Sequence, residues 1–358
     1  MAGQYQNNIR KGTSPYATEQ NDPNDSGCPD FGSAVSRIRL PDGTEKLFSW
    51  RYSDTAPQDS TPASFTEVSV PKITQEDTAA LAKEFEDEFG ITIVTRDQVP
   101  ETYYNYHITQ LDDEESIFSA LLLLQAACRN YPKGMFRQVD LSTGKMKILL
   151  ADDITDTSDT SVKSPPGIAV GTNLVLAASA RLGRATVYHE INHILVSHME
   201  SRGGEEDLTV NFGALNPEGF VYGSNYKEEN SVQYTPLDPE DTDYANTYFA
   251  SDYGKTNENE DMSEMMGGLM GSVLPDDYCK GAHIQAKYRY LFGLFRKYFD
   301  TDGWDRQLTW EKRVGLSHRD GIRLSQTPKR HRKNLHLLSE IDGGFFYGSF
   351  ICSRYQPN

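Results

Sequence analysis

Two histidines four residues apart, with a glutamate between them, are the residues of this chain best suited to chemistry: His189-Glu190-Ile191-Asn192-His193. In an α-helix, residues i and i+4 lie about 40° apart around the axis, so His189 and His193 share one face. Their imidazoles can then bind one zinc ion, and Glu190 projects beside the metal, where it can take a proton from water. The HExxH pattern predicts a zinc-dependent hydrolase; a structural pair of histidines on an apolar helix is the alternative.

A catalytic zinc site needs a third protein ligand, which must come from another part of the chain. His198 is the nearest candidate, but five residues after His193 it points roughly 140° away around the same helix. Glu260 and Glu264 are four residues apart in a segment that favours a helix. One carboxylate can bind zinc while the other accepts a hydrogen bond from a ligating histidine. An ordinary helix start, with Asn257 and Glu260 as a capping box, is the alternative.

The segment over residues 251–264, SDYGKTNENEDMSE, resembles the second active-site helix of anthrax lethal factor and related gluzincins. It is similar as well to zinc-binding metallopeptidase lipoproteins of bacterial surfaces. In these proteins HExxH comes first, and a Tyr-Gly then precedes an Asn-Glu-x-Glu stretch with a further glutamate four residues later. The resemblance is specific over residues 186–198 and 253–264, and elsewhere it is limited to the order of the elements.

The resemblance implies a zinc-dependent metalloendopeptidase with three zinc ligands, His189, His193 and Glu260. It also implies that Glu190 is the general base and that Tyr253 is the phenol that stabilises the tetrahedral intermediate. Glu264 would hold the second nitrogen of a ligating histidine. Two departures affect the substrate groove more than the metal site: residues 261–263 are Asp-Met-Ser where relatives carry aromatic and small residues, and residues 205–247 have no counterpart.

The expected order of helices and strands favours an α+β fold. Two short strands joined by a turn at residues 41–43 precede a linker over residues 54–71. A helix is expected to begin after Thr74 and to stop at Gly90, followed by a strand over residues 91–94 and a helix that starts near residue 112. Strands are expected over residues 145–150 and 167–179 before the HExxH helix. Later helices are expected over residues 257–270 and 283–299.

Taken with the resemblance, this order predicts a two-lobed zincin with a small mixed sheet. We expect a disordered extension over residues 1–30 and a single catalytic domain over residues 31–358. Its N-lobe, residues 31–204, carries the HExxH helix, and its C-lobe, residues 205–358, carries Glu260. Residues 205–247 are rich in turn formers and are expected to be a loop insertion. A peptide would lie between the lobes, along the edge strand near residues 168–176.

Charge and composition restrict the partners. The net charge of −17 argues against nucleic acid, whose binding needs basic patches. No apolar run approaches the roughly 18 residues that can span a bilayer. The polar first residues contain no signal-peptide core. Because a polar lead-in of this kind often tethers a secreted domain to a signal or a membrane anchor, we expect a secreted or surface protein whose leader or lipid anchor lies outside this sequence. A cytoplasmic location is the alternative. We expect a monomer that acts on peptides or proteins.

The cysteines and one aromatic-rich segment leave two questions open. Cys28, Cys128, Cys279 and Cys352 show no CxxC spacing, which argues against a zinc knuckle and leaves two disulfides open. Cys128 falls in an apolar helix and is expected to be buried. The rival function is a catalytically inactive zincin-fold surface protein that binds a peptide or glycan. Residues 216–226, with their aromatic side chains, favour that rival, whereas the intact Glu190 and Tyr253 oppose it. An ordered surface loop whose aromatic side chains pack inward is the alternative for this segment.

Overall fold

The computed structural model describes residues 33–39, 45–51, 72–141, 144–157, 164–178, 182–223, 246–271, 274 and 278–316. Their contacts form two compact units, one up to Glu84 and one from Phe85 onward. The expected extension over residues 1–30, the turn at residues 41–43 and the linker over residues 54–71 lie outside the described residues. No helix in the described part of the chain is long and apolar enough to cross a membrane.

The first unit contains a hairpin and the start of a helix. β1 (Ser33–Arg39) pairs with β2 (Glu45–Arg51) in antiparallel register, as expected. α1 (Gln75–Phe89) begins after Thr74, whose N–H donates to Asp77 Oδ2 at 2.8 Å while its hydroxyl accepts from the Asp77 N–H at 3.3 Å. These reciprocal bonds satisfy N–H groups that no helical carbonyl can reach. The predicted start of this helix is confirmed.

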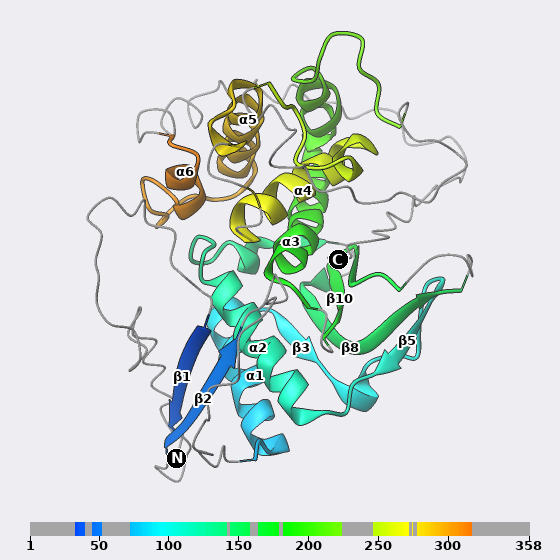
Figure 1. The fold of residues 1–358 in the computed structure, drawn as a ribbon, viewed down its shortest axis with the longest axis vertical. Helices are drawn as coiled ribbons and strands as arrows, with labels where there is room; N and C mark the ends of the chain where they lie inside the picture. Colours follow the sequence, from blue (N-terminus) through cyan, green and yellow to red (C-terminus); the bar gives the residue numbers. More distant parts are fainter. Residues whose placement is uncertain are drawn as a thin grey trace, which may run out of the picture. The chain divides into compact units, whose positions relative to one another are not determined.

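The second unit is built on a mixed sheet with the strand order β4-β5-β8-β10-β9, and β3 also pairs with β8 (Figure 1). β8 is parallel to β3 and β10 and antiparallel to β5. A separate short ladder joins β6 and β7. The strands are β3 (Thr92–Val94), β4 (Thr102–Tyr103), β5 (Tyr106–Gln110), β6 (Asp140–Leu141), β7 (Gly144–Lys145), β8 (Lys147–Asp156), β9 (Gly167–Val170) and β10 (Asn173–Ala177).

The single strand expected over residues 167–179 is wrong, because this segment is a hairpin. β9 and β10 pair in antiparallel register, and Gly171 turns between them with φ of 61°, a conformation that favours glycine. The prediction joined the two apolar runs into one strand and overlooked Gly171-Thr172-Asn173, the turn-forming residues that lie between them. As a result β9 forms the edge of the sheet, whereas β10 lies inside it between β8 and β9.

The long helices agree with the sequence prediction: α2 (Glu114–Cys128), α3 (Arg184–Met199), α4 (Glu258–Gly271) and α5 (Ala282–Tyr298). A short helix, α6 (Thr309–Arg313), has no counterpart in that prediction. The chain also stays largely helical after α3, through wider π-helical turns at Glu200–Gly204 and Asp207–Asn211. The loop expected over residues 205–247 is therefore wrong for its first part, and residues 224–245 lie outside the described residues.

The sheet gives α3 a fixed base. Because side chains alternate along a strand, Leu174 and Leu176 of β10 point to one face and Val175 to the other, and all three are fully buried. Gly167 of β9 is opposite Leu176 and lies against Glu190 of α3, so α3 packs on the face that carries the two leucines. The described structure is thus an α+β fold with a small mixed sheet, as the sequence predicts.

Candidate metal centre

The HExxH residues lie on α3, a helix that is buried on nearly every side. This burial explains why its apolar residues surround the axis instead of forming one stripe. His189 and His193 are on one face, and their ring centroids are 4.7 Å apart. The four-residue spacing therefore has the geometric effect that the sequence predicts.

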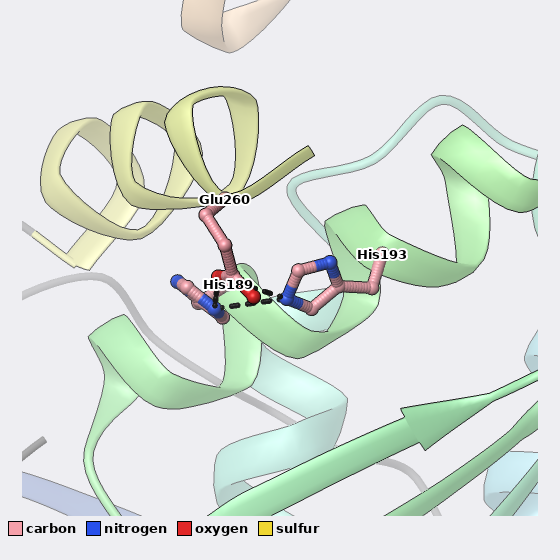
Figure 2. A group of neighbouring side chains, drawn as sticks. All are labelled: His189, His193 and Glu260. Atoms are coloured by element: carbon pink, nitrogen blue, oxygen red, sulfur yellow. Dashed lines mark hydrogen bonds and ion pairs between the residues drawn. The ribbon is translucent and has the colours of Figure 1, made fainter. Parts of the chain in front are cut away.

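Three ligand atoms converge above this face of α3. The Nε2 atoms of His189 and His193 are 3.0 Å apart, and Glu260 Oε2 lies 3.2 Å from the first and 3.5 Å from the second. Figure 2 shows Glu260 reaching from α4 toward the two imidazoles of α3. All three side chains are buried, and this group could hold a metal ion.

The opposite nitrogens of the two rings are occupied by other partners. His189 Nδ1 lies 2.8 Å from Glu264 Oε1, and His193 Nδ1 lies 2.9 Å from Asn259 Oδ1. Both partners offer oxygen acceptors, so with a metal ion bound each Nδ1 can keep the ring proton and each Nε2 can present a lone pair to the ion. Two lone pairs and a carboxylate oxygen then face one another at hydrogen-bond distance, an arrangement that a cation at the centre would stabilise.

The buried charges agree with a centre that favours positive charge. Burial alone would raise the pKa of Glu260, but His193 and His189 lower it to about 2. Burial would lower the pKa of His193, whereas the Glu260 carboxylate opposite holds it above its usual value. The group therefore keeps an ionised carboxylate beside two imidazoles although all three are shielded from water.

The first turn of α4 positions Glu260 through a helix cap. Asn257 Oδ1 accepts a hydrogen bond from the Glu260 N–H at 2.9 Å. The Glu260 carboxylate is directed at His189 and His193. The two interpretations of this segment are thus compatible. The helix cap uses the backbone N–H of Glu260, and the candidate site uses its side chain.

Close packing of α4 on α3 brings Glu260 within reach of the histidines. A Cβ atom on Gly267 would lie 3.0 Å from the Ala185 carbonyl oxygen and 3.3 Å from His189 Cβ. On Gly271 it would lie only 2.7 Å from Ala185 Cα. Glycine at these two positions lets the helix backbones approach to a distance that side chains would prevent. This role is not among the sequence predictions, although the spaced glycines of α4 are a visible signal.

Glu190 is fully buried next to the candidate ligand His189, and the edge strand β9 lies directly against it. A Cβ atom on Gly167 would be 2.8 Å from Glu190 Cγ and 3.1 Å from its Oε1. Only glycine at position 167 leaves room for this side chain in its present position. The HExxH pattern predicts a role for Glu190, whereas no pattern in the sequence singles out Gly167.

Tyr253 and Glu264 also lie at the centre. The ring of Tyr253, in the short 3-10 turn η5 (Tyr253–Lys255), lies 6.3 Å from the His189 ring at an interplanar angle of 27°. Glu264 binds His189 through one oxygen and accepts a hydrogen bond from the Ser251 hydroxyl at 2.6 Å through the other. Ser251, like Asn259, was not identified from the sequence.

Several other residues stay outside the centre. His198 is buried with its ring 4.5 Å from that of Phe299, so it is not part of the group, as its position on the helix predicts. Cys128 and Cys279 are buried free thiols, which confirms the expected burial of Cys128. Cys28 and Cys352 lie outside the described residues.

No protein-family model matches the chain, and comparisons with curated proteins and with solved structures find no match either.

Proposed function

We propose that the protein is a zinc-dependent metalloendopeptidase of the gluzincin type, with a two-lobed zincin fold. The observation that carries the proposal is the convergence of His189 Nε2, His193 Nε2 and Glu260 Oε2, with Glu190 adjacent to the first ligand. We further propose that the protein is secreted or bound to a cell surface and acts as a monomer on peptides or proteins.

The donor set suits zinc and argues against calcium and magnesium. Two imidazole nitrogens and one carboxylate oxygen are typical ligands of catalytic zinc, which keeps a fourth position open. With zinc–ligand bonds of about 2 Å and tetrahedral angles, ligand atoms are separated by about 3.3 Å. The three separations of 3.0, 3.2 and 3.5 Å fit that value. Calcium and magnesium prefer oxygen ligands, so the two imidazoles argue against them.

The chain's own residues supply the remaining chemistry of peptide hydrolysis. A bound zinc ion would supply Lewis acidity, which polarises the scissile carbonyl and makes water more acidic. Glu190 takes a proton from the water that adds to the carbonyl carbon and delivers it to the amine nitrogen as the C–N bond breaks. The Tyr253 phenol donates a hydrogen bond to the carbonyl oxygen as its negative charge develops. Glu264 and Asn259 orient the two imidazoles.

The edge strand β9 offers a binding surface for an extended peptide. Pro166 accepts a hydrogen bond from the Ala177 N–H at 2.9 Å, which fixes the alternation along the antiparallel pair. Ile168 then exchanges bonds with Val175, whereas the backbone groups of Gly167 and Ala169 point away from β10. A peptide added to this edge would pair with Gly167 and Ala169, next to the Glu190 carboxylate.

Metal analysis tests the ligand set first. We expect about one zinc ion per chain in the wild type, none in Glu260→Ala, and affinity weaker by about 10- to 100-fold in Glu264→Ala. Glu258→Ala, two residues before Glu260 on the same helix, is the matched control and should keep its zinc. Zinc retained in Glu260→Ala, or absent from the wild type, would contradict the proposed site.

Catalysis is tested separately with Glu190→Gln, which removes the general base and keeps the shape of the side chain. This variant should bind zinc like the wild type and lose cleavage of a quenched fluorescent peptide library. Cleavage that persists in Glu190→Gln would refute the mechanism. A zinc-loaded wild type that cleaves nothing in the library would favour the rival, a surface binding protein.

A further inference from the structure

A second buried group of charges lies next to the metal centre and has no part in the chemistry above. Asp261 directly follows the proposed ligand Glu260 on α4, and Lys287 lies on α5. Lys287 Nζ is 2.5 Å from Asp261 Oδ2, and neither side chain is exposed to solvent. The Tyr222 hydroxyl donates to the same oxygen at 2.7 Å.

Two aromatic rings lie close to the Lys287 ammonium group. Its Nζ atom lies 4.0 Å from the ring centroid of Phe249 and 5.5 Å from that of Phe212. At these distances the ring faces attract the cation. Lys287 therefore links α4 to two other segments, the one that follows α3 and the one that leads to Tyr253.

The segment that carries Tyr253 also rests directly on Asp261. A Cβ atom on Gly254 would lie 3.4 Å from Asp261 Cα and 3.6 Å from Asp261 Oδ1. Phe249, which contacts Lys287, is four residues before Tyr253. The ion pair thus contacts the Tyr253 segment at two residues, Phe249 and Gly254. Its carboxylate belongs to Asp261, the residue that follows Glu260.

Stability alone does not explain a pair of this kind. Desolvation of two charges is expensive, and well-packed neutral side chains often replace a buried ion pair without loss of stability. A directional pair with several partners can, however, select one arrangement of the segments that it joins.

We propose that Asp261 and Lys287 are positioning residues, which hold the Tyr253 segment against α4 and so fix the Tyr253 phenol relative to Glu260. The inference rests on the proposed function only for the roles of Tyr253 and Glu260. The pair itself acts on the backbone of residues 249–256 and does not touch the reacting atoms.

The test removes both charges with side chains of similar shape, in the double variant Asp261→Asn/Lys287→Met. Amide hydrogen exchange is measured over residues 249–256, with α2 as the internal reference. Cobalt(II) is titrated into the metal-free chain, because its visible absorption reports the arrangement of its ligands. We expect exchange over residues 249–256 to accelerate at least tenfold while α2 is unchanged, and cobalt(II) to bind about tenfold more weakly with an altered spectrum.

The matched control removes a second buried ion pair, that of Arg296 and Glu311, whose Nε and Oε1 atoms are 2.7 Å apart. Arg296→Met/Glu311→Gln should leave the exchange of residues 249–256 and the cobalt spectrum unchanged. Unchanged exchange in the Asp261/Lys287 variant would overturn the inference, as would equal acceleration in the control or in α2. A wild type that binds no cobalt would refute the proposed function, while the exchange of residues 249–256 alone would still decide the positioning role.

Discussion

Gly167→Ala is the substitution that most directly tests the link between the edge strand and Glu190. The new methyl carbon would stand 2.8 Å from Glu190 Cγ and 3.0 Å from its Cδ. Carbon atoms in contact prefer separations of about 3.5–4.0 Å, so Glu190 or β9 must move by about 1 Å. Glu190 is fully buried, and the side chain has little free space in which to adjust.

The magnitude of the effect follows from this displacement. A misplacement of about 1 Å in a catalytic group can cost about 100-fold in rate. Alanine itself suits an extended backbone at least as well as glycine, so the strand should not be weakened by its conformation. We therefore expect kcat to fall about 100-fold while the zinc content stays at one ion per chain.

The assay combines steady-state cleavage of the best peptide from the quenched library with zinc analysis of the same sample. Gly213→Ala is the matched control, because a Cβ atom there would lie 3.8 Å from its nearest neighbours, at ordinary contact distance. The reasoning would be refuted by a Gly167→Ala enzyme with unchanged kcat. It would equally be refuted if zinc were lost in parallel with activity, because the steric conflict would then act on the ligands and not on Glu190.

Three further predictions concern the packing, the peptide surface and the pH dependence of stability. Gly271→Ala places a methyl group 2.7 Å from Ala185 Cα. Although alanine favours the helix, this methyl group should separate α4 from α3. Cobalt(II) binding, measured by titration, should weaken at least tenfold. Ala169→Pro removes one outward N–H from the edge strand without breaking the bonds to β10. The peptide then loses one hydrogen bond, so KM should rise about tenfold. The melting temperature should be unchanged. Burial lowers the pKa of His198 to about 4, so between about pH 6.5 and 4 the unfolded chain binds the additional proton, and stability falls as the pH falls through this window. His198→Phe, which keeps the contact with Phe299, should remove up to about 2 kcal/mol of that pH dependence in urea unfolding at pH 7 and pH 4.5; equal pH dependence in both proteins would contradict it.

The parts of the site that the sequence predicts are those that need only one helix. His189 and His193 meet because a helix brings every fourth residue to the same face, and the same spacing applies to Glu260 and Glu264. The caps of α1 and α4 are local in the same sense, since Thr74 and Asn257 bond to residues three positions away. Each of these interactions lies within one turn of backbone and can be read from residue types alone.

The missed features depend on contacts between distant segments. The turn at Gly171 is different, because Gly171-Thr172-Asn173 does interrupt the apolar pattern; a turn can be predicted from these residues, but the pairing of the two strands depends on the packed sheet. Asn259 precedes Glu260 in a polar run, and only the packing of α4 on α3 brings its amide oxygen to His193. Lys287 looks like a surface residue of an amphipathic helix, and its burial against Asp261 depends on a partner 26 residues away.

Three glycines determine the geometry of the centre, because each leaves space that a side chain would fill. Gly167 leaves the space that Glu190 occupies, and Gly267 and Gly271 allow α4 to approach α3 closely enough for Glu260 to reach two imidazoles. Residue types in the sequence identify the candidate ligands, because these carry groups that bind a metal. They do not identify the three glycines, which carry no such group. The same three positions fix the distance between the proposed general base, the edge strand and the candidate ligands, so substitutions there should change the chemistry of the site while every functional side chain is retained.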